Sequence, residues 1–413
     1  MKEITKMKSP VRTILIAIAL LLSFFPTGFL YALDYPANAI VVLLCWTFAF
    51  PSMLGVISSL LLPLCLSEAY GYFAFNLICV TTTIGAAASL RRCSIADEVW
   101  TRAYRVAEFC ICATIFICLW QALDGQFWLR IFPFLQGIGG GRGCGLRSEP
   151  SLLAAPLALF LSLLAYRMHR VSGSSSRYVV EALIVIVGTI ALTRSLSVAI
   201  AAACFIPAFR LRLSYLLLPM CVVLGVMALI FGDRIQHAAT MAENSPLVFM
   251  TVAFGSWRNV PDILMLANYK DYLVPHNPVL LREHLGALAS AWDPSFSWLE
   301  NTYSTFSASA STLGLIVTTL LFVSGGVVGM RTLPRATGVR STWAALYISA
   351  WFVFPKFEAC GWVSLGVLMF VYDGASKPST NRILSLFAKL LHEAYLSGDP
   401  RKTAPLPKPQ GFA

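Results

Sequence analysis

Apolar segments long enough to cross a lipid bilayer recur along most of this sequence, and they restrict its fold more than any other feature. A membrane-spanning helix needs about 20 predominantly apolar residues. The 413 residues are 57% hydrophobic and only 12% charged, with a mean hydropathy of +0.72. A soluble domain carries roughly 25% charged residues and could not bury this much apolar surface. We therefore predict an all-α polytopic membrane protein.

About twelve transmembrane helices can be placed on these apolar segments. Pro51 divides one long apolar stretch, which predicts either a helical hairpin or a single kinked span. No internal repeat is evident, and this disfavours a transporter built from inverted halves. The approximate spans are 12–32, 37–50, 52–67, 70–90, 104–122, 150–168, 178–193, 195–209, 214–231, 309–330, 341–355 and 357–373.

The distribution of basic residues predicts how the chain is threaded through the membrane. Short cytoplasmic loops of membrane proteins carry an excess of Lys and Arg. With the N-terminus inside, the inside segments hold 22 of the 31 Lys and Arg residues. We therefore predict that both termini are cytoplasmic. The net charge of +11 follows from this rule, and no interleaved basic and aromatic patch points to a nucleic-acid partner.

This threading divides the chain into four parts. Residues 1–231 hold nine expected spans and a short Gly/Arg-rich outer loop at about 123–149. A large outer loop follows at 232–308, and the last three spans occupy 309–373. Residues 374–413 are polar and rich in proline, so we expect a disordered cytoplasmic tail.

The short outer loop combines glycines with charged residues. Five glycines within residues 139–145 would let the backbone approach a ligand closely. Arg142 and Arg147 flank the end of this stretch, and guanidinium groups suit phosphate and pyrophosphate. Glu149 and Pro150 also form a good helix start, which is the structural explanation for the same residues. Two arginines beside a glycine-rich segment at a membrane boundary favour an anion site.

The large outer loop offers aromatic and titratable side chains. Trp257 and other aromatic residues, together with polar groups such as Arg258, suit sugar rings, although an interfacial aromatic belt has the same aromatic composition. His276 is a candidate general base, since the pKa of histidine lies near neutral pH. No third ligand stands at metal spacing from His276 and His284, so we predict no metal site. Arg194, expected at another outer turn, either snorkels or joins the anion site.

These residues resemble a family of bacterial membrane enzymes. The stretch from Arg147 through Glu149-Pro150-Ser151, opening a membrane helix after an outer loop, is similar to the Glu-Pro-Ser stretch of O-antigen and exopolysaccharide polymerases of the Wzy type. Three further stretches also resemble this superfamily over about residues 100–330, whereas a Gly-x-Gly expected in the late loop is missing. They are Thr193-Arg194-Ser195, Trp257-Arg258-Asn259 and His276-Asn277.

The resemblance implies a GT-C-like helical fold in the bacterial inner membrane and a metal-independent glycosyltransferase without a soluble cofactor. Such enzymes transfer a growing chain from undecaprenyl pyrophosphate onto a new lipid-linked repeat unit at the periplasmic face. We expect Arg142, Arg147 and Arg258 to neutralise the pyrophosphate leaving group, with Trp257 and Arg194 also binding substrate. Either Glu149 or His276 would accept the proton of the acceptor hydroxyl. The expected partners are the lipid-linked oligosaccharide, membrane lipids, and a flippase and chain-length regulator of the same pathway.

Three other functions remain open at this point. An O-antigen ligase, which joins finished polymer to lipid A–core, uses the same chemistry. A flippase or transporter of lipid-linked oligosaccharide suits about twelve helices, but the charged residues concentrate in outer loops rather than in mid-membrane. A membrane peptidase with Cys144 as nucleophile would need an activating base, and no such spacing is visible.

Overall fold

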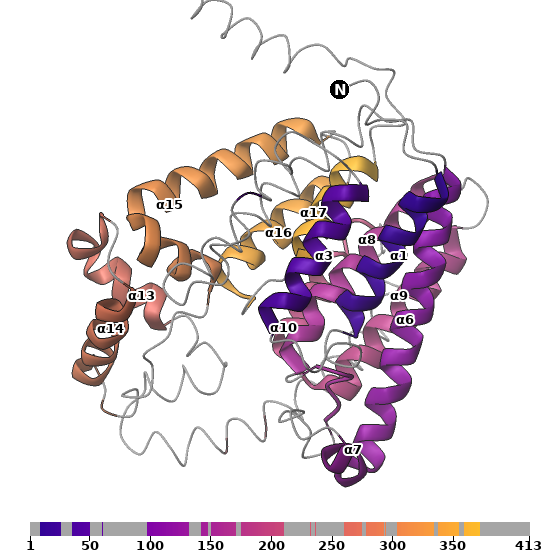
Figure 1. The fold of residues 1–413 in the computed structure, drawn as a ribbon, viewed down its shortest axis with the longest axis horizontal. Helices are drawn as coiled ribbons and strands as arrows, with labels where there is room; N and C mark the ends of the chain where they lie inside the picture. The colour runs from indigo at the N-terminus through magenta and orange to yellow at the C-terminus, as the bar shows by residue number, and fades with distance from the viewer. Residues whose placement is uncertain are drawn as a thin grey trace, which may run out of the picture. The chain divides into compact units, whose positions relative to one another are not determined.

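The described part of the chain is helical. It forms α-helices, short 3-10 helices and turns, with no β-strand among its elements (Figure 1), so the all-α prediction is confirmed for these residues. Apart from Leu60, the expected spans 52–67, 70–90 and 214–231 and the tail 374–413 lie outside them. The computed structural model describes residues 9–25, 35–49, 60, 97–131, 142–147, 150–170, 175–209, 232, 236, 260–274, 278–292, 294, 304–333, 338–354 and 359–371.

Helices occupy the apolar segments that the described residues cover. Those on expected spans are α1 (Ser9–Phe24), α3 (Tyr35–Ala49), α6 (Asp97–Leu123), η3 (Pro150–Leu153) with α8 (Ala154–Arg170), α9 (Ser175–Thr193), α10 (Leu196–Cys204), α15 (Thr305–Thr332), α16 (Gly338–Phe352) and α17 (Ala359–Val371). Those in the expected outer loops are α7 (Gly125–Ile131), α13 (Val260–Ala267), η5 (Tyr269–Tyr272) and α14 (Pro278–Trp292). Both outer loops therefore contain helical structure.

Four of the described helical segments are long and apolar enough to cross a membrane. Their outward-facing side chains are apolar as well: Phe116 on α6 is 62% exposed and Leu320 on α15 is 64% exposed. Apolar helix faces of this kind are stable in contact with lipid tails. These helices therefore indicate a membrane protein. The four segments are Glu98–Leu123, Pro150–His169, Ser176–Thr193 and Leu313–Arg331.

Helix α8 lies at the centre of the helices that carry the candidate site. Its side chains from Ala154 to Tyr166 are all buried, and the helix packs against α6, α9, α10 and α17 (Figure 1). A helix that is apolar on every side is covered either by other helices or by lipid, and the described contacts of α8 are with other helices. Helix α1 packs against α3 and α6. The residues before α8 are therefore held at the end of a closely packed group of helices.

Close packing between α15 and α16 depends on small residues facing aromatic rings. A Cβ added at Gly329 would lie 1.9 Å from the ring of Trp343, and one added at Gly325 would lie 2.5 Å from the hydroxyl of Tyr347. That hydroxyl donates a hydrogen bond of 2.8 Å to the carbonyl of Phe322. Small residues let helices approach closely in membranes, where apolar burial alone does not drive association.

Helix α15 is broken at Gly314, where the segment after α13 packs against it. Gly314 has φ 79° and ψ 158°, and a Cβ there would lie 2.4 Å from the carbonyl oxygen of Leu273. At the start of α15, the hydroxyl of Ser304 donates to the carboxylate of Asp262 on α13 at 2.6 Å. The same hydroxyl accepts from the backbone N–H of Ser307 and caps the helix. Helices α13 and η5 are thus attached to α15.

Candidate functional site

The segment 142–147 is attached to the end of α6 by one buried side chain, Gln121. Its amide nitrogen donates to the carbonyl of Gly145 at 2.6 Å. Its amide oxygen accepts from the backbone N–H groups of Cys144 at 2.9 Å and Gly145 at 3.0 Å. Three backbone groups that would otherwise be buried without partners are satisfied in this way. Gln121 therefore holds Cys144 and Gly145 against the end of α6.

The described glycines of this segment serve packing within the protein. A Cβ added at Gly143 would lie 2.6 Å from both the Cα and the carbonyl oxygen of Cys118, so only glycine lets the backbone approach α6 this closely. Gly145 has φ 63°, a left-handed conformation in which side chains are strained. The backbone N–H of Gly143 also donates to the carbonyl of Leu192 on α9 at 2.9 Å.

Arg147 is buried at the end of α1. Its side chain is 1% exposed, and one guanidinium nitrogen donates to the carbonyl of Ser23 in the last turn of α1. Carbonyls in the last turn of a helix lack partners within the helix and carry the negative end of its dipole. Arg147 thus joins the segment to α1, and in this arrangement its guanidinium is shielded from solvent.

Arg142 and Arg194 are the predicted site residues that the structure brings together with access to solvent. Arg142 is exposed, and Arg194 is half-buried at the two-residue corner between α9 and α10. The Gly143–Leu192 hydrogen bond places the two arginines on adjoining segments, because Arg142 precedes Gly143 and Arg194 follows Leu192 by two residues. Arg194 has φ 47°, an uncommon backbone conformation for a residue other than glycine.

The other predicted site residues lie outside the described part of the chain. These residues are Trp257, Arg258, Glu149 and His276. Their predicted roles therefore stay predictions.

Cys144 is a buried structural thiol. It is fully buried, and its sulfur lies 3.8 Å from the carbonyl of Gly145. Burial, and to a smaller extent the neighbouring Cys118, raise the pKa of the Cys144 thiol to about 12. A nucleophilic cysteine needs a lowered pKa and access to its substrate, so these properties oppose the peptidase interpretation.

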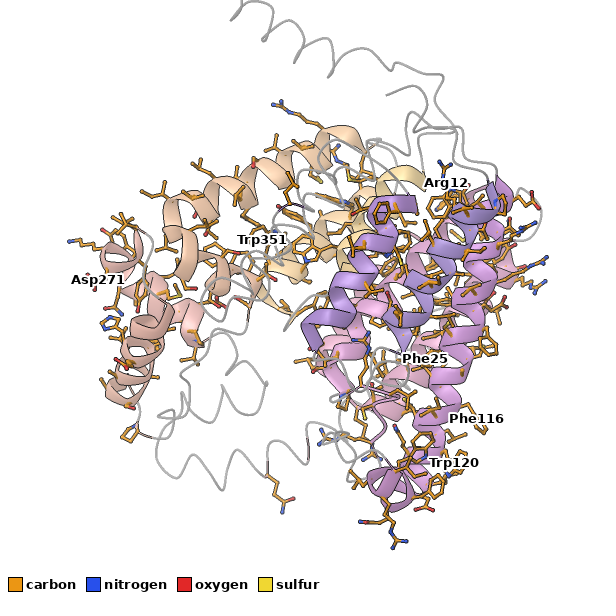
Figure 2. All side chains as sticks on the ribbon, viewed as in Figure 1. Arg12, Phe25, Phe116, Trp120, Asp271 and Trp351 are labelled. Atoms are coloured by element: carbon orange, nitrogen blue, oxygen red, sulfur yellow. The ribbon has the colours of Figure 1, made fainter. Side chains whose placement is uncertain are left out.

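Aromatic side chains surround the same end of α6. Figure 2 shows Phe116 and Trp120 along the part of α6 that leads into α7. Trp120 stacks on Phe127 with ring centroids 5.2 Å apart and meets Trp128 edge-on at 5.5 Å. Tryptophan at a helix end is typical of the boundary between membrane and water. This belt is consistent with a site at the membrane surface.

Gln121 is the residue of this site that sequence reasoning missed. It stands directly after a long uncharged run from Phe109 to Trp120, near the end of an expected span. A single amide at that place is costly in lipid unless it has partners, and this was the available signal. Among the described residues, no group of three or more His, Cys, Asp or Glu side chains could hold a metal ion.

Comparisons of the chain with protein-family models, with curated proteins and with solved structures gave no match. We therefore infer the function of the chain from the residues of the site and from the sequence resemblance.

Proposed function

We propose that this chain is a polysaccharide polymerase of the inner membrane. It transfers undecaprenyl-pyrophosphate-linked oligosaccharide chains onto a new lipid-linked repeat unit at the periplasmic face, as a glycosyltransferase that needs no metal. The observation that carries the proposal is the pairing of two cationic segments, one with Arg142 and one with Arg194, through the Gly143–Leu192 hydrogen bond. A pyrophosphate leaving group needs fixed positive charge as its bond to the sugar breaks.

The arginines have different roles in this proposal. Arg142 is exposed and Arg194 is half-buried, so they meet the pyrophosphate. Arg147 is a positioning residue, because its guanidinium is used by the carbonyl of Ser23. Arg258 and Trp257 contribute to substrate binding from the large outer loop.

The general base of the proposed reaction is Glu149 or His276. Glu149 directly precedes Pro150, the first residue of the 3-10 helix that leads into α8. Proton transfer by a positioned base contributes about 10²- to 10⁴-fold to rate. Transfer then needs no cofactor, since the lipid carrier supplies the energy of the sugar–phosphate bond.

The test replaces Arg142 and Arg194, which are accessible, and leaves the buried Arg147 intact. Arg142→Ala and Arg194→Asn are expressed in cells that depend on this chain for long polysaccharide; asparagine tolerates the backbone conformation of residue 194. We expect transfer to fall by about a hundredfold, as when one transition-state donor is lost. Gel analysis should show short chains, while immunoblots show normal amounts of protein in the membrane.

Arg130→Ala is the matched control, because Arg130 is an exposed arginine on the neighbouring α7. This control should retain chains of normal length. Normal length in both site variants would contradict the proposal. Accumulation of finished polymer on the lipid carrier would instead indicate a ligase, and accumulation of repeat units in the inner leaflet would indicate a flippase.

A further inference from the structure

Two buried cysteines meet where segment 142–147 packs against α6. Cys118 on α6 is 2% exposed, Cys144 in the segment is fully buried, and both are free thiols in the structure. Cys144 stands between Gly143 and Gly145, and a Cβ at either of these glycines would touch Cys118. Cys118 therefore lies beside the stretch of backbone that carries Cys144.

The separation of the two cysteines suits a covalent bond. A Cβ at Gly143 would lie 2.6 Å from the Cα of Cys118, which limits the Cα atoms of Cys118 and Cys144 to about 8 Å apart. Disulfides usually join Cα atoms roughly 4.4–6.8 Å apart. A Cβ at Gly145 would lie 3.9 Å from the sulfur of Cys118, and the sulfur of Cys144 lies 3.8 Å from the carbonyl oxygen of the same Gly145. Both sulfurs therefore approach one residue.

The backbone at Cys144 is curled, which keeps its side chain near α6. The consecutive N–H groups of Cys144 and Gly145 donate to one acceptor, the amide oxygen of Gln121, at 2.9 and 3.0 Å. Successive N–H groups converge in this way where the backbone curls, whereas successive residues of an extended strand point to opposite faces. Ile117, which directly precedes Cys118, packs against the apolar cluster that contains Cys144.

The expected surroundings of this cysteine pair are oxidising. The charge pattern of the sequence predicts that the end of α6 with segment 142–147 is on the periplasmic face. Disulfides form and persist in the bacterial periplasm, whereas cytosolic thiols stay reduced. Of the cysteines on α6, Cys118 is the nearest to this end, since Cys110 and Cys112 lie about two turns earlier.

We propose that Cys118 and Cys144 form a disulfide bond that links segment 142–147 to α6. The oxidant is the disulfide of a periplasmic thiol–disulfide oxidoreductase, which acts before packing buries the two sulfurs. The thiolate of one cysteine attacks that disulfide, forms a mixed disulfide and releases one thiolate of the oxidant. The thiolate of the other cysteine then attacks the first cysteine's sulfur and releases the second. The protein loses two electrons and two protons, and the oxidant leaves as a dithiol.

The bond adds a covalent link to the hydrogen bonds of Gln121. It closes the loop between residues 118 and 144. Closing a loop of this size restricts the unfolded chain and so stabilises the folded one. The inference uses the predicted orientation of the chain, but it does not depend on the proposed transfer reaction.

The full-length wild-type protein tests the bond directly. Free thiols are trapped by acid precipitation of the cells and then modified with N-ethylmaleimide in denaturant, before the protein is digested with trypsin without reductant. Cleavage after Arg142 and Arg147 releases residues 143–147. Mass spectrometry should show this peptide joined to residues 106–130, and dithiothreitol should separate the two. Recovery of residues 143–147 only as the N-ethylmaleimide adduct would overturn the proposal.

A second cleavage identifies the partner of Cys144. Chymotrypsin cuts after Phe116 and so separates Cys118 from Cys110 and Cys112. In the matched control Cys118→Ser, Cys144 should be recovered as the N-ethylmaleimide adduct although the two earlier cysteines of α6 remain. A bond from Cys144 to Cys110 or Cys112 in the wild type would overturn the proposal.

Thermal unfolding measures what the bond contributes. Wild-type protein purified in neutral detergent is heated with and without a phosphine reductant. We expect the reductant to lower the melting temperature by at least about 3 °C, and to leave that of Cys118→Ser unchanged. An unchanged wild type, or an equal decrease in both proteins, would show that the bond does not stabilise the fold and would overturn the proposal.

Discussion

Helix α1 has a buried arginine at each end, and the two differ in what surrounds the charge. At its last turn, Arg147 comes from another part of the chain and donates to the carbonyl of Ser23. Toward the other end, Arg12 belongs to the helix itself and is 8% exposed, and its guanidinium makes no hydrogen bond or ion pair with the described residues. The helix dipole favours a cation at the last turn, where Arg147 lies. Burial alone therefore does not define the role of an arginine; its partner does.

The contact between Arg147 and α1 has a functional consequence for segment 142–147. If Arg147 is fixed to α1 and Gln121 fixes the backbone, the segment presents Arg142 in one position. Preorganised charge stabilises a transition state without further ordering. The buried arginine thus acts on the proposed reaction through the placement of the exposed one.

Replacing each buried arginine with methionine should have opposite effects in lipid-free neutral detergent. Arg147→Met removes the charged donor to Ser23, and we expect the free energy of unfolding to fall by about 3 kcal/mol. Arg12→Met removes a buried charge that lacks a partner, and we expect a rise of about 1 kcal/mol. Thermal or denaturant unfolding of the two purified variants measures both changes.

Arg142→Met is the control for this pair, because Arg142 is exposed and its replacement should change stability by no more than about 0.5 kcal/mol. The structural role given to Arg147 is wrong if Arg147→Met is no less stable than this control. The interpretation of Arg12 as a buried charge without a partner is wrong if Arg12→Met destabilises the lipid-free protein as much as Arg147→Met does.

Loss of the Gln121 side-chain amide should have the next largest effect. Gln121→Leu keeps the volume but leaves three backbone groups at Cys144 and Gly145 without partners. We expect about 2 kcal/mol of destabilisation, because buried groups without partners lose their hydration without replacement. Limited proteolysis should then cut segment 142–147 faster. Gln126→Leu, at an exposed position on α7, is the matched control; equal cleavage in both variants would show that Gln121 does not fix the segment.

The main helices were predictable because their signal is local. The expected span 104–122 lies within α6, and the expected span 178–193 lies within α9. Long apolar runs between charged residues encode such helices directly. The helices α7, α13 and α14 were missed because they are shorter than the roughly 20 residues of a membrane span and lie in segments that were assigned as loops.

The sequence predicted which arginines belong to the candidate site, but it did not predict which groups they contact. The sequence pattern predicted that Arg142, Arg147 and Arg194 belong to the same outer face, and the described contacts place their segments at one end of the helices. The burial of Arg147 could not be predicted, since its partner Ser23 is 124 residues away. The requirement for glycine at position 143 could not be predicted either, because it is Cys118 on α6 that leaves no room for a side chain there. Only tertiary packing sets these distances.

The reactivity of Cys144 tests the same segment with the smallest effect on stability. Burial raises the pKa of its thiol to about 12 from 9.0, so at pH 7 the thiol is protonated in both folded and unfolded chains. As pH rises from about 9 to 12, the unfolded chain loses its proton first and stability falls. At pH 8.5, iodoacetamide should label folded Cys144 about a thousandfold more slowly than an exposed thiol, because so little thiolate is present. The exposed thiol introduced by Arg142→Cys, in a background without other cysteines, provides the reference two residues away. Rapid labelling of native Cys144 would mean that the segment opens in solution, and the burial of Arg147 against α1 would then not hold.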